Sequence, residues 1–268
     1  MESTFYGLTV NPFDKQNVTS ANRFESRDFL EVQGRIQFLC KTRGIGLFTA
    51  RPGMGKTFAL RYFAENLKPG LNTVAYMQLT TVSVNEFYKQ LCALLGLDTC
   101  GGKVRLFKAA KEEIYYRYKE KKKPLILIID EAQYLSTSIL TDLKMLMNYN
   151  YDSINCFTLI LCGESRLNST LRSPVHEALA QRIMVNYEFQ GLREDEISEY
   201  VLHKIRTANG STEIIDESGL SALNSLSQSN PRIIDNLMYD ALLIGYQLKK
   251  NVIDSEVIQA AVANRTFS

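Results

Sequence analysis

Histidine and closely spaced cysteine are scarce in this sequence, and their scarcity argues against a metal centre built from them. Only two His occur in 268 residues, and the five Cys are scattered without a Cys-x-x-Cys pair. Structural zinc and iron–sulfur sites need such ligands at short spacings, so none is expected. Cys92 and Cys162 fall in apolar stretches, which indicates buried free thiols in a reducing compartment.

A long hydrophobic run is also missing. A membrane-spanning helix needs about 20 apolar residues, whereas the longest run here, residues 125–130 (LILIID), has the length of a strand. The N-terminus, MESTFYGLTVNPF, lacks a basic segment followed by an apolar one, so we expect no signal peptide. The sequence therefore predicts a cytoplasmic protein with no membrane association.

Strong net charge is the third absence. The chain has 31 Lys and Arg against 29 Asp and Glu, a formal charge of +2. This balance excludes a protein dedicated to coating nucleic acid, and any such binding needs a local patch or many copies acting together. The one charge run, YKEKKK at 118–123, is expected to be a solvated helix end.

Strand-like and helix-like stretches alternate in the first two thirds of the chain. The strand-like runs are apolar at nearly every position, which is typical of strands buried on both faces of a parallel sheet. With helices between them they predict an α/β domain covered on both sides. The predicted strands are residues 45–49, 73–79, 125–129, 157–162 and 183–189.

After Gly191 no strand-like run remains, and the sequence predicts a small all-helical domain. Asp216 and Asp254 are suitable N-caps for two of its helices. The four predicted helices are residues 194–208, 217–226, 231–249 and 255–263.

The first predicted strand leads directly into ARPGMGKT, residues 50–57, which is a P-loop with Ala50 in place of the usual first Gly. The two glycines let backbone N–H groups turn inward around a phosphate, and the next helix contributes its N-terminal dipole. Lys56 is expected to reach the β- and γ-phosphates of ATP, and the Thr57 hydroxyl to ligate Mg²⁺. The predicted nucleotide-binding residues of this segment are Pro52, Gly53, Met54, Gly55, Lys56, Thr57 and Phe58.

Two carboxylates end the apolar strand about 75 residues further on. Burying such charges is costly unless they have a role. Asp130 is expected to bind the nucleotide and hold the Mg²⁺ shell, and Glu131 to activate the attacking water as general base. The P-loop and this pair form the two halves of an ATP-hydrolysing site.

These two halves resemble the Walker A and Walker B motifs of AAA+ ATPases, and the resemblance extends over nearly the whole chain. It implies a P-loop AAA+ core followed by a small helical lid. It also implies a sensor 1 residue, either Glu164 or Ser165, after the strand at 157–162. In ALAQRI, Arg182 is the expected arginine finger, with Arg172 as second choice, and Arg232 in SNPR is the expected sensor 2.

Within AAA+ proteins, the sequence is similar to the ATPases that accompany transposases (TnsC, MuB and IstB) and to the related ATPase domain of ExeA-type secretion proteins. The phrases that carry this likeness are FYGLTVNPF, FESRDF, DEAQYL, LILCGESRL and LAQRI. The resemblance implies three segments: residues 1–40 packing on the nucleotide site, the α/β domain at 41–190, and the lid at 191–268. Phe5, Phe13 and Phe24 are expected either in the adenine pocket, on a neighbouring subunit, or in the core.

The transposition-type resemblance implies that ATP lies between adjacent subunits of a ring or helical filament on duplex DNA, which is presented to a transposase. DNA contact is then mainly to phosphates, with little sequence selectivity, because no DNA-reading segment is expected after the lid. The proposed contact region follows the second strand and includes the flexible Gly101–Gly102. Its candidate residues are Thr80, Thr81, Lys103, Arg105 and Lys108.

Four alternatives stay open at this point. An ExeA-type secretion ATPase is expected to add a membrane span and a cell-wall-binding domain. A replication-initiator or clamp-loader relative usually carries an extra domain, and a helicase, suggested by the letters DEAQ, needs a second α/β domain. A nucleotide-gated scaffold with negligible turnover is the fourth.

Overall fold

The computed structural model describes residues 2–17, 22–68, 70–78, 83–151 and 153–265. These residues form two compact units, each discontinuous in sequence. The first unit comprises residues 1–30, 53–55 and 190–268, and the second comprises residues 31–52 and 56–189. The division predicted from sequence used three consecutive segments instead.

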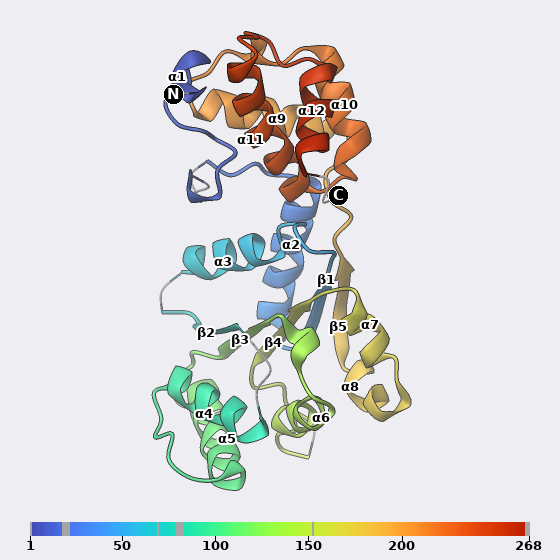
Figure 1. The fold of residues 1–268 in the computed structure, drawn as a ribbon. Helices are drawn as coiled ribbons and strands as arrows, with labels where there is room; N and C mark the ends of the chain where they lie inside the picture. Colours follow the sequence, from blue (N-terminus) through green and yellow to red (C-terminus); the bar gives the residue numbers. More distant parts are fainter. Residues whose placement is uncertain (1, 18–21, 69, 79–82, 152, 266–268) are drawn as a thin grey trace. The chain divides into compact units, whose positions relative to one another are not determined.

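A five-stranded parallel sheet is the centre of the second unit (Figure 1). The strands run in the order β2-β3-β4-β1-β5, so the chain crosses over between β1 and β2 and again between β4 and β5. This arrangement confirms the predicted α/β fold class. The strands are β1 (Ile45–Thr49), β2 (Thr73–Gln78), β3 (Leu125–Asp130), β4 (Thr158–Gly163) and β5 (Ile183–Glu188).

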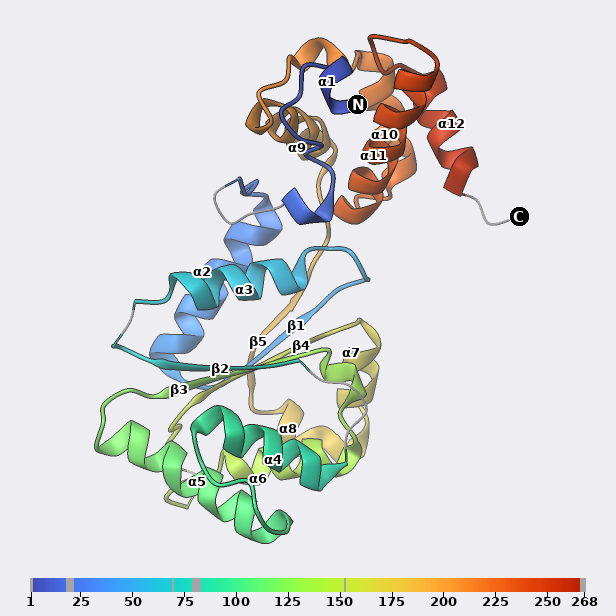
Figure 2. The ribbon, with the colours of Figure 1, turned by 60° about the vertical axis from the view of Figure 1, so that its left-hand side comes forward.

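Helices cover both faces of this sheet (Figures 1 and 2). The part of α2 that belongs to this unit and α3 lie on one face, and α4, α5 and α6 lie on the other. The short α7 and α8 stand between β4 and β5 in sequence; they have six and four residues, too few to show a helical period. The helix bounds are α2 (Arg27–Thr42), α3 (Lys56–Asn66), α4 (Val84–Leu95), α5 (Lys103–Lys119), α6 (Thr137–Leu146), α7 (Arg166–Leu171) and α8 (Glu177–Ala180).

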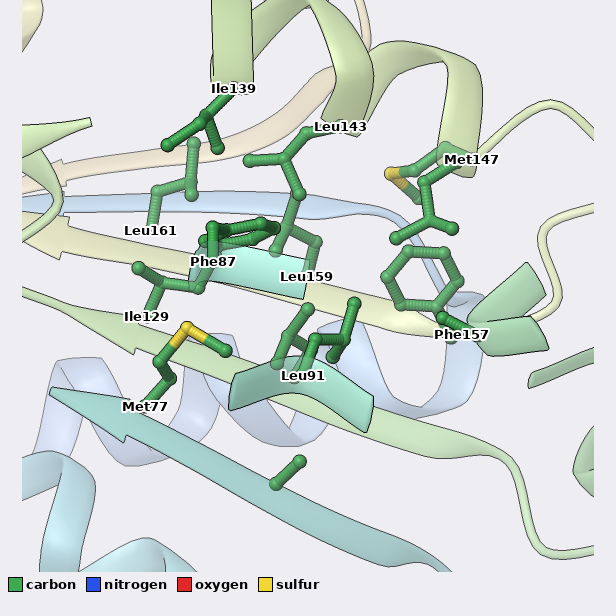
Figure 3. Packing of buried hydrophobic residues seen from close by; sticks show 14 of the residues in the cluster. Met77, Phe87, Leu91, Ile129, Ile139, Leu143, Met147, Phe157, Leu159 and Leu161 are labelled. Atoms are coloured by element: carbon green, nitrogen blue, oxygen red, sulfur yellow. The ribbon is translucent and has the colours of Figure 1, made fainter. Parts of the chain in front are cut away.

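Alternation along β3 assigns its side chains to the two faces. Leu125, Leu127 and Ile129 join the large core beneath α4, α5 and α6, where Figure 3 shows Ile129 near Met77 and Leu91. Residues 126, 128 and 130 must therefore point to the face that α3 covers. An apolar strand buried on both faces thus delivers its terminal Asp130 toward the start of α3.

The first unit is helical and has its own core. Its main helices are α9 (Glu194–Thr207), α10 (Glu217–Ser227), α11 (Pro231–Gln247) and α12 (Ser255–Arg265), and the short α1 (Glu2–Phe5) precedes them in sequence. Asp216 accepts a hydrogen bond from the Gly219 N–H, and Asp254 accepts one from the Val257 N–H, so both predicted N-caps are confirmed. Pro231 begins α11 as the sequence predicted.

The N-terminal aromatic residues pack in this helical unit. Phe13 is buried in its core, and Phe24 packs edge-on against Tyr200. Phe5 makes edge contacts with Tyr6 and Tyr246 and stays partly exposed. Core packing is therefore the observed role of Phe13 and Phe24.

The five cysteines are all free thiols. Cys92, Cys156 and Cys162 are buried and Cys40 is half-buried, whereas Cys100 is exposed. In the part of the chain that the structure describes, no helix combines the length and apolarity that crossing a bilayer requires. Nor do its His, Cys, Asp and Glu side chains gather into a group of three that could hold a metal.

Candidate nucleotide-binding site

The two predicted halves of the site meet at Asp130, which is fully buried at the carboxyl end of β3. Its Oδ2 accepts hydrogen bonds from the Thr57 hydroxyl at 2.8 Å and from the Tyr76 hydroxyl at 2.6 Å. Thr57 lies in the first turn of α3, which directly follows the P-loop. The structure thus brings together Thr57 and Asp130, which the sequence predicted as the magnesium ligands.

Tyr76 is a member of this site that the sequence did not predict. It lies in β2, the strand next to β3, and its hydroxyl points at the same carboxylate oxygen as Thr57. Burial, reinforced by the hydrogen bond to Asp130, raises the pKa of Tyr76 well above its ordinary value. The phenol therefore stays protonated and acts as a hydrogen-bond donor to Asp130.

Lys56 is buried with only 7% of its surface exposed. Its ammonium donates to the backbone carbonyls of Ala50 at 3.0 Å and Arg51 at 3.2 Å, both in the loop that precedes α3. A buried charge needs such partners. The ammonium is consequently held against the backbone of its own loop, and a bound phosphate group could replace these carbonyls as its partner.

The Glu131 side chain is held by Gln133, which the sequence did not predict as a site residue. The Gln133 side-chain amide donates to Glu131 Oε2 at 2.6 Å, while its Oε1 accepts the backbone N–H of Glu164 at 2.9 Å. Gln133 therefore connects the predicted general base to the carboxyl end of β4. Glu131 itself is half-buried and adopts a left-handed backbone conformation, φ 57°, which is uncommon for a non-glycine residue.

Gly163 makes room for this connection. A Cβ atom at position 163 would lie 2.5 Å from Gln133 Oε1, which is closer than non-bonded atoms approach. Glycine at the end of β4 therefore allows the Gln133 side chain to reach the strand. The sequence contains both phrases, DEAQ at 130–133 and CGES at 162–165, but only the fold shows that they touch.

The residues that follow β4 make polar contacts of their own. Ser165 donates its hydroxyl to Glu188 at 2.7 Å, and Glu164 forms an ion pair with Arg166. Asn168, which the sequence reading passed over, donates to the Thr49 hydroxyl at the end of β1 at 2.9 Å. Both predicted sensor 1 candidates thus lie at the expected strand end, and Asn168 is a third polar side chain there.

The middle of the P-loop, residues 53–55, belongs to the first unit. Gly53 has a left-handed φ of 89°, and a Cβ there would meet Asn230 Oδ1 at 2.6 Å and Arg232 Cβ at 2.8 Å. Asn230 caps α11 by accepting the Arg232 N–H. Within the first unit, the start of α11, which carries the predicted sensor 2 residue Arg232, therefore packs directly against Gly53.

Arg182 lies near the amino end of β1, whereas the P-loop follows its carboxyl end. It immediately precedes Ile183, which pairs with Ile45, the first residue of β1. At about 3.3 Å per residue, the two ends of β1 are separated by about 13 Å. Arg172 is exposed at the end of α7.

The predicted DNA-contact residues divide into two groups. Thr80 and Thr81 lie outside the described residues. The other three lie in the first half of α5, each with an acidic neighbour: Lys103 with Asp142 at 2.7 Å, Arg105 with Asp98 at 2.7 Å, and Lys108 with Glu112 at 3.8 Å.

The donor set fits the two groups that the motifs imply. The Thr57 hydroxyl and the Asp130 carboxylate are oxygen ligands of the kind that Mg²⁺ prefers, and they already lie within hydrogen-bonding distance of each other. The Lys56 ammonium and the left-handed glycines Gly53 and Gly55 suit a polyphosphate. Phe58 follows on α3 beneath the Arg61 guanidinium, and Pro52 is exposed at the start of the loop.

Comparison with known proteins agrees with this geometry. Residues 39–171 match the family model described as AAA domain. The chain contains an AAA-type P-loop ATPase domain. A domain of this type binds ATP, typically together with Mg²⁺.

Proteins similar to this chain include one curated protein and several solved structures. General secretion pathway protein A of Aeromonas hydrophila is 29% identical over 247 residues, which is 91% of this chain and 44% of that protein. The chain thus spans less than half the length of this relative.

Among solved structures, Cdc6p of Pyrobaculum aerophilum has a TM-score of 0.72 at 14% identity, covering 96% of this chain and 71% of that one. ORC1 of Aeropyrum pernix in complex with DNA has a TM-score of 0.67 at 13% identity, covering 94% and 68%. The Thermotoga maritima RuvB Holliday junction branch migration motor has a TM-score of 0.59 at 16% identity, covering 91% and 72%. At these identities the likeness concerns the fold, which is that of AAA+ proteins.

Proposed function

We propose that this protein is an ATP-hydrolysing switch that assembles on duplex DNA as copies of itself and regulates transposition by selecting the target and recruiting or activating a transposase. The observation that carries the ATPase part is the network around Asp130, in which Thr57, Tyr76 and Glu131 converge on one buried carboxylate. Such a cluster at the end of a parallel strand, next to a P-loop, suits phosphoryl transfer to water.

Each residue of the network has a distinct proposed task. Lys56 and the P-loop backbone bind and orient the phosphates, and Thr57 with Asp130 holds the Mg²⁺, which neutralises phosphate charge when bound. Glu131 accepts a proton from the attacking water, and Gln133 holds its carboxylate in position. Arg232, at the start of α11, is proposed to contact the γ-phosphate.

The position of Arg182 supports a proposal that copies of the chain assemble. Because this arginine lies beyond the amino end of β1, it is remote from the P-loop of its own chain. It can serve a nucleotide only when a second copy presents its P-loop to it. Bound ATP then supplies the negative charge that Arg182 recognises, so assembly depends on ATP and weakens after hydrolysis.

DNA as a partner is supported by the resemblance to transposition ATPases and by proteins of the same fold whose structures contain DNA, such as ORC1 of Aeropyrum pernix. Repetition of a modest contact in an assembly multiplies its effect, which reconciles DNA binding with a net charge of +2. We expect contacts mainly with phosphates, little sequence preference, and a cytoplasmic location without a membrane partner.

A secretion-associated ATPase is the second candidate. The relative of Aeromonas hydrophila, named for the general secretion pathway, favours it directly. In that case the same nucleotide switch acts on a protein partner rather than on DNA. A replication-initiator-like role, favoured by the fold likeness to Cdc6p, differs again because it predicts loading onto defined DNA sites.

Electron microscopy of the purified protein with long duplex DNA separates these candidates. The samples contain ATP or a slowly hydrolysed analogue, ADP, or the Lys56→Ala variant with ATP. We expect rings or filaments on DNA with the triphosphate alone, and none with ADP or with Lys56→Ala. If no sample assembles on DNA, the DNA function is wrong and the protein-directed candidate takes its place.

A further inference from the structure

Positive charge in this chain is concentrated in one segment. Residues 103–123, which form α5 and the turn after it, contain nine basic and three acidic residues, a net charge of +6. The whole chain carries only +2, so the remaining residues together are net negative. A polyanion that approaches the molecule is therefore drawn to this segment.

The two halves of the segment differ in how this charge is neutralised. In the first half, Lys103, Arg105 and Lys108 each form an ion pair with a carboxylate. At the other end, Lys119, Lys122 and Lys123 are exposed and form no ion pair within the described residues. Their charge is available to a ligand, and phosphates are its natural partners.

Aromatic side chains lie beside this available charge. Tyr115 of α5 stacks on Tyr149, with ring centroids 5.9 Å apart and planes inclined by 11°. The Lys111 ammonium lies 5.3 Å from the Tyr149 centroid, and the Tyr149 hydroxyl donates to the Lys111 carbonyl at 3.1 Å. These contacts fix the chain that follows α6 against the side of α5.

Tyr151 extends from this fixed base into solvent. Its side chain is 100% exposed, and both Asn150 and Tyr151 adopt left-handed backbone angles, with φ of 47° and 57°. The Ser153 N–H and hydroxyl bond to the Asn150 carbonyl and hold the turn in this conformation. Backbone in this region is strained, and such strain tends to occur where a site must be preformed.

A hollow of about 520 Å³ lies between α5 and this turn. Its walls combine aromatic rings, such as Tyr115 and Tyr149, with the amides of Asn148 and Asn150, the ammonium of Lys111, and the ion pair of Lys108 with Glu112. Ligand pockets in proteins are commonly of about this size and combine apolar walls with a few polar groups. Rings offer stacking, amides offer hydrogen bonds to ring edges, and lysines offer contacts to phosphates.

We propose that this surface, defined by Lys111, Tyr115, Lys119, Lys122, Lys123, Asn148, Tyr149, Asn150 and Tyr151, binds single-stranded nucleic acid. Bases stack on Tyr151 and enter the hollow, while Lys119, Lys122 and Lys123 contact the phosphates. The ligand is single-stranded because the faces of bases within a duplex are already stacked. An acidic protein segment would neutralise the lysine charges. It has no planar groups, however, that could stack on the tyrosine rings and hydrogen-bond with the amides of Asn148 and Asn150.

This inference rests on the proposed function only in assigning a nucleic acid as ligand, and it concerns a surface that is separate in sequence from the nucleotide site. In the proposed assembly on duplex DNA, the surface would hold an unpaired strand next to the bound duplex. It requires neither ATP nor hydrolysis, so it can be tested without them.

The lack of tryptophan in the chain provides a specific test. The Tyr151→Trp variant has one indole, whose fluorescence is quenched when a base stacks on it. We expect saturable quenching by an oligothymidylate of about 20 nucleotides in the absence of ATP. The matched duplex and polyglutamate should not quench it, and neither should oligothymidylate quench a control Tyr239→Trp variant, whose indole lies on α11.

Affinity measurements on the otherwise unchanged chain complete the test. Loss of one stacking contact is worth about 1–3 kcal/mol, so Tyr151→Ala should weaken oligothymidylate binding about 5- to 150-fold by fluorescence anisotropy. Tyr151→Phe should bind like the parent protein. Lys122→Ala/Lys123→Ala should weaken binding and lower its salt dependence, whereas the ion-paired control Lys103→Ala/Arg105→Ala should have a smaller effect.

Two results would overturn the inference: unchanged affinity in Tyr151→Ala, or equal quenching of Tyr151→Trp by polyglutamate, which would indicate an acidic protein partner. Duplex assembly with ATP is scored separately on the same preparations. Quenching without duplex assembly contradicts the proposed function but supports single-strand binding at this surface. Duplex assembly without quenching supports the proposed function and contradicts single-strand binding at this surface.

Discussion

At the scale of single residues, the buried carboxylate of Asp130 organises the nucleotide site. One of its oxygens accepts two hydroxyl donors, Thr57 and Tyr76, and the other accepts the Glu131 N–H at 2.9 Å. A buried carboxylate is tolerable only when such donors satisfy it. If Thr57 turns toward a bound Mg²⁺, Tyr76 remains as the side-chain donor that keeps Asp130 in place.

Removal of the Tyr76 hydroxyl should therefore destabilise the fold. In Tyr76→Phe the buried Asp130 loses one donor, and we expect the free energy of unfolding to fall by about 1–3 kcal/mol, measured by urea denaturation. The matched control is Tyr239→Phe, a partly exposed tyrosine of α11. Equal stability of the two variants would contradict the role given to Tyr76.

Gln133 should act on turnover rather than on binding. In Gln133→Ala the Glu131 carboxylate loses its amide donor, and we expect kcat for ATP hydrolysis to fall about 10- to 100-fold, within the range that positioned acid–base groups contribute. The dissociation constant of ATP should change little, because the hydrogen bonds of the Gln133 side chain join it to Glu131 and Glu164. Steady-state kinetics together with a fluorescent-nucleotide titration measure the two quantities.

Gly163→Ala offers an independent route to the same defect, because its Cβ displaces the Gln133 amide. The double variant Gln133→Ala/Gly163→Ala should then be no slower than the slower single variant. Additive losses in the double variant, or a loss of ATP affinity in Gln133→Ala, would show that Gln133 does not act through Glu131.

At the scale of elements, the helical unit has a buried ion pair between two of its helices. Lys204 of α9 donates to Asp235 of α11 at 2.6 Å, and Tyr200 donates to the same carboxylate at 2.9 Å. Burial lowers the pKa of Lys204 and raises the pKa of Asp235, so each charge depends on the other. The pair therefore fixes the register of α9 on α11 more than it adds stability.

Breaking this pair on one side should be worse than replacing both sides. Asp235→Ala leaves the buried Lys204 ammonium unpaired, and we expect a loss of about 3–5 kcal/mol in the free energy of unfolding. Lys204→Met/Asp235→Leu removes both charges and should lie much closer to the parent protein. Denaturant unfolding of both variants measures the difference, and a double variant as unstable as Asp235→Ala would contradict the account.

Elements with a strong local signal could be predicted from the sequence, whereas contacts between distant elements could not. The strands β1, β3 and β4 are nearly continuous apolar runs, and the helices that follow Asp216 and Asp254 begin at recognisable caps. The short α7 and α8 have no period to detect. Tyr76 and Gln133 belong to the site only because β2 and β4 flank β3, and a single sequence does not reveal that order.

The same limit applies to charged surfaces. Lys103, Arg105 and Lys108 look available in the sequence, but the fold places carboxylates of other segments beside the first two. The run that begins at Lys119 was expected to be only a solvated helix end, yet the Lys119 ammonium lies 5.6 Å from the centroid of Tyr115, which stacks on Tyr149. Ion pairs between residues distant in sequence decide how much charge remains for a ligand. The spacing of charged residues along the sequence does not reveal these pairs.

At the scale of the whole molecule, the proposed mechanism requires more than one copy. Arg182→Ala should bind ATP like the parent protein but hydrolyse it at least about 100-fold more slowly, because the loss of a transition-state arginine is worth about 10³–10⁵ in kcat. Lys56→Ala is inactive for a different reason and keeps its own Arg182.

Mixing these two inactive variants should restore part of the activity. A junction that pairs the P-loop of Arg182→Ala with the arginine of Lys56→Ala is complete. Phosphate release by equimolar mixtures measures this, with the matched mixture of Arg172→Ala and Lys56→Ala run alongside to compare the two arginines. A mixture no more active than its components would argue against Arg182 acting between copies.

The most direct test of the central assignment is to measure ATP binding and phosphate release for three proteins: the parent chain, Glu131→Gln and Lys56→Ala. We expect Glu131→Gln to bind ATP as tightly as the parent chain while its turnover falls at least about 100-fold, the loss expected for a general base. Lys56→Ala should lose both binding and turnover. Undiminished hydrolysis by Glu131→Gln, or undiminished ATP binding by Lys56→Ala, would contradict the assignment of this site.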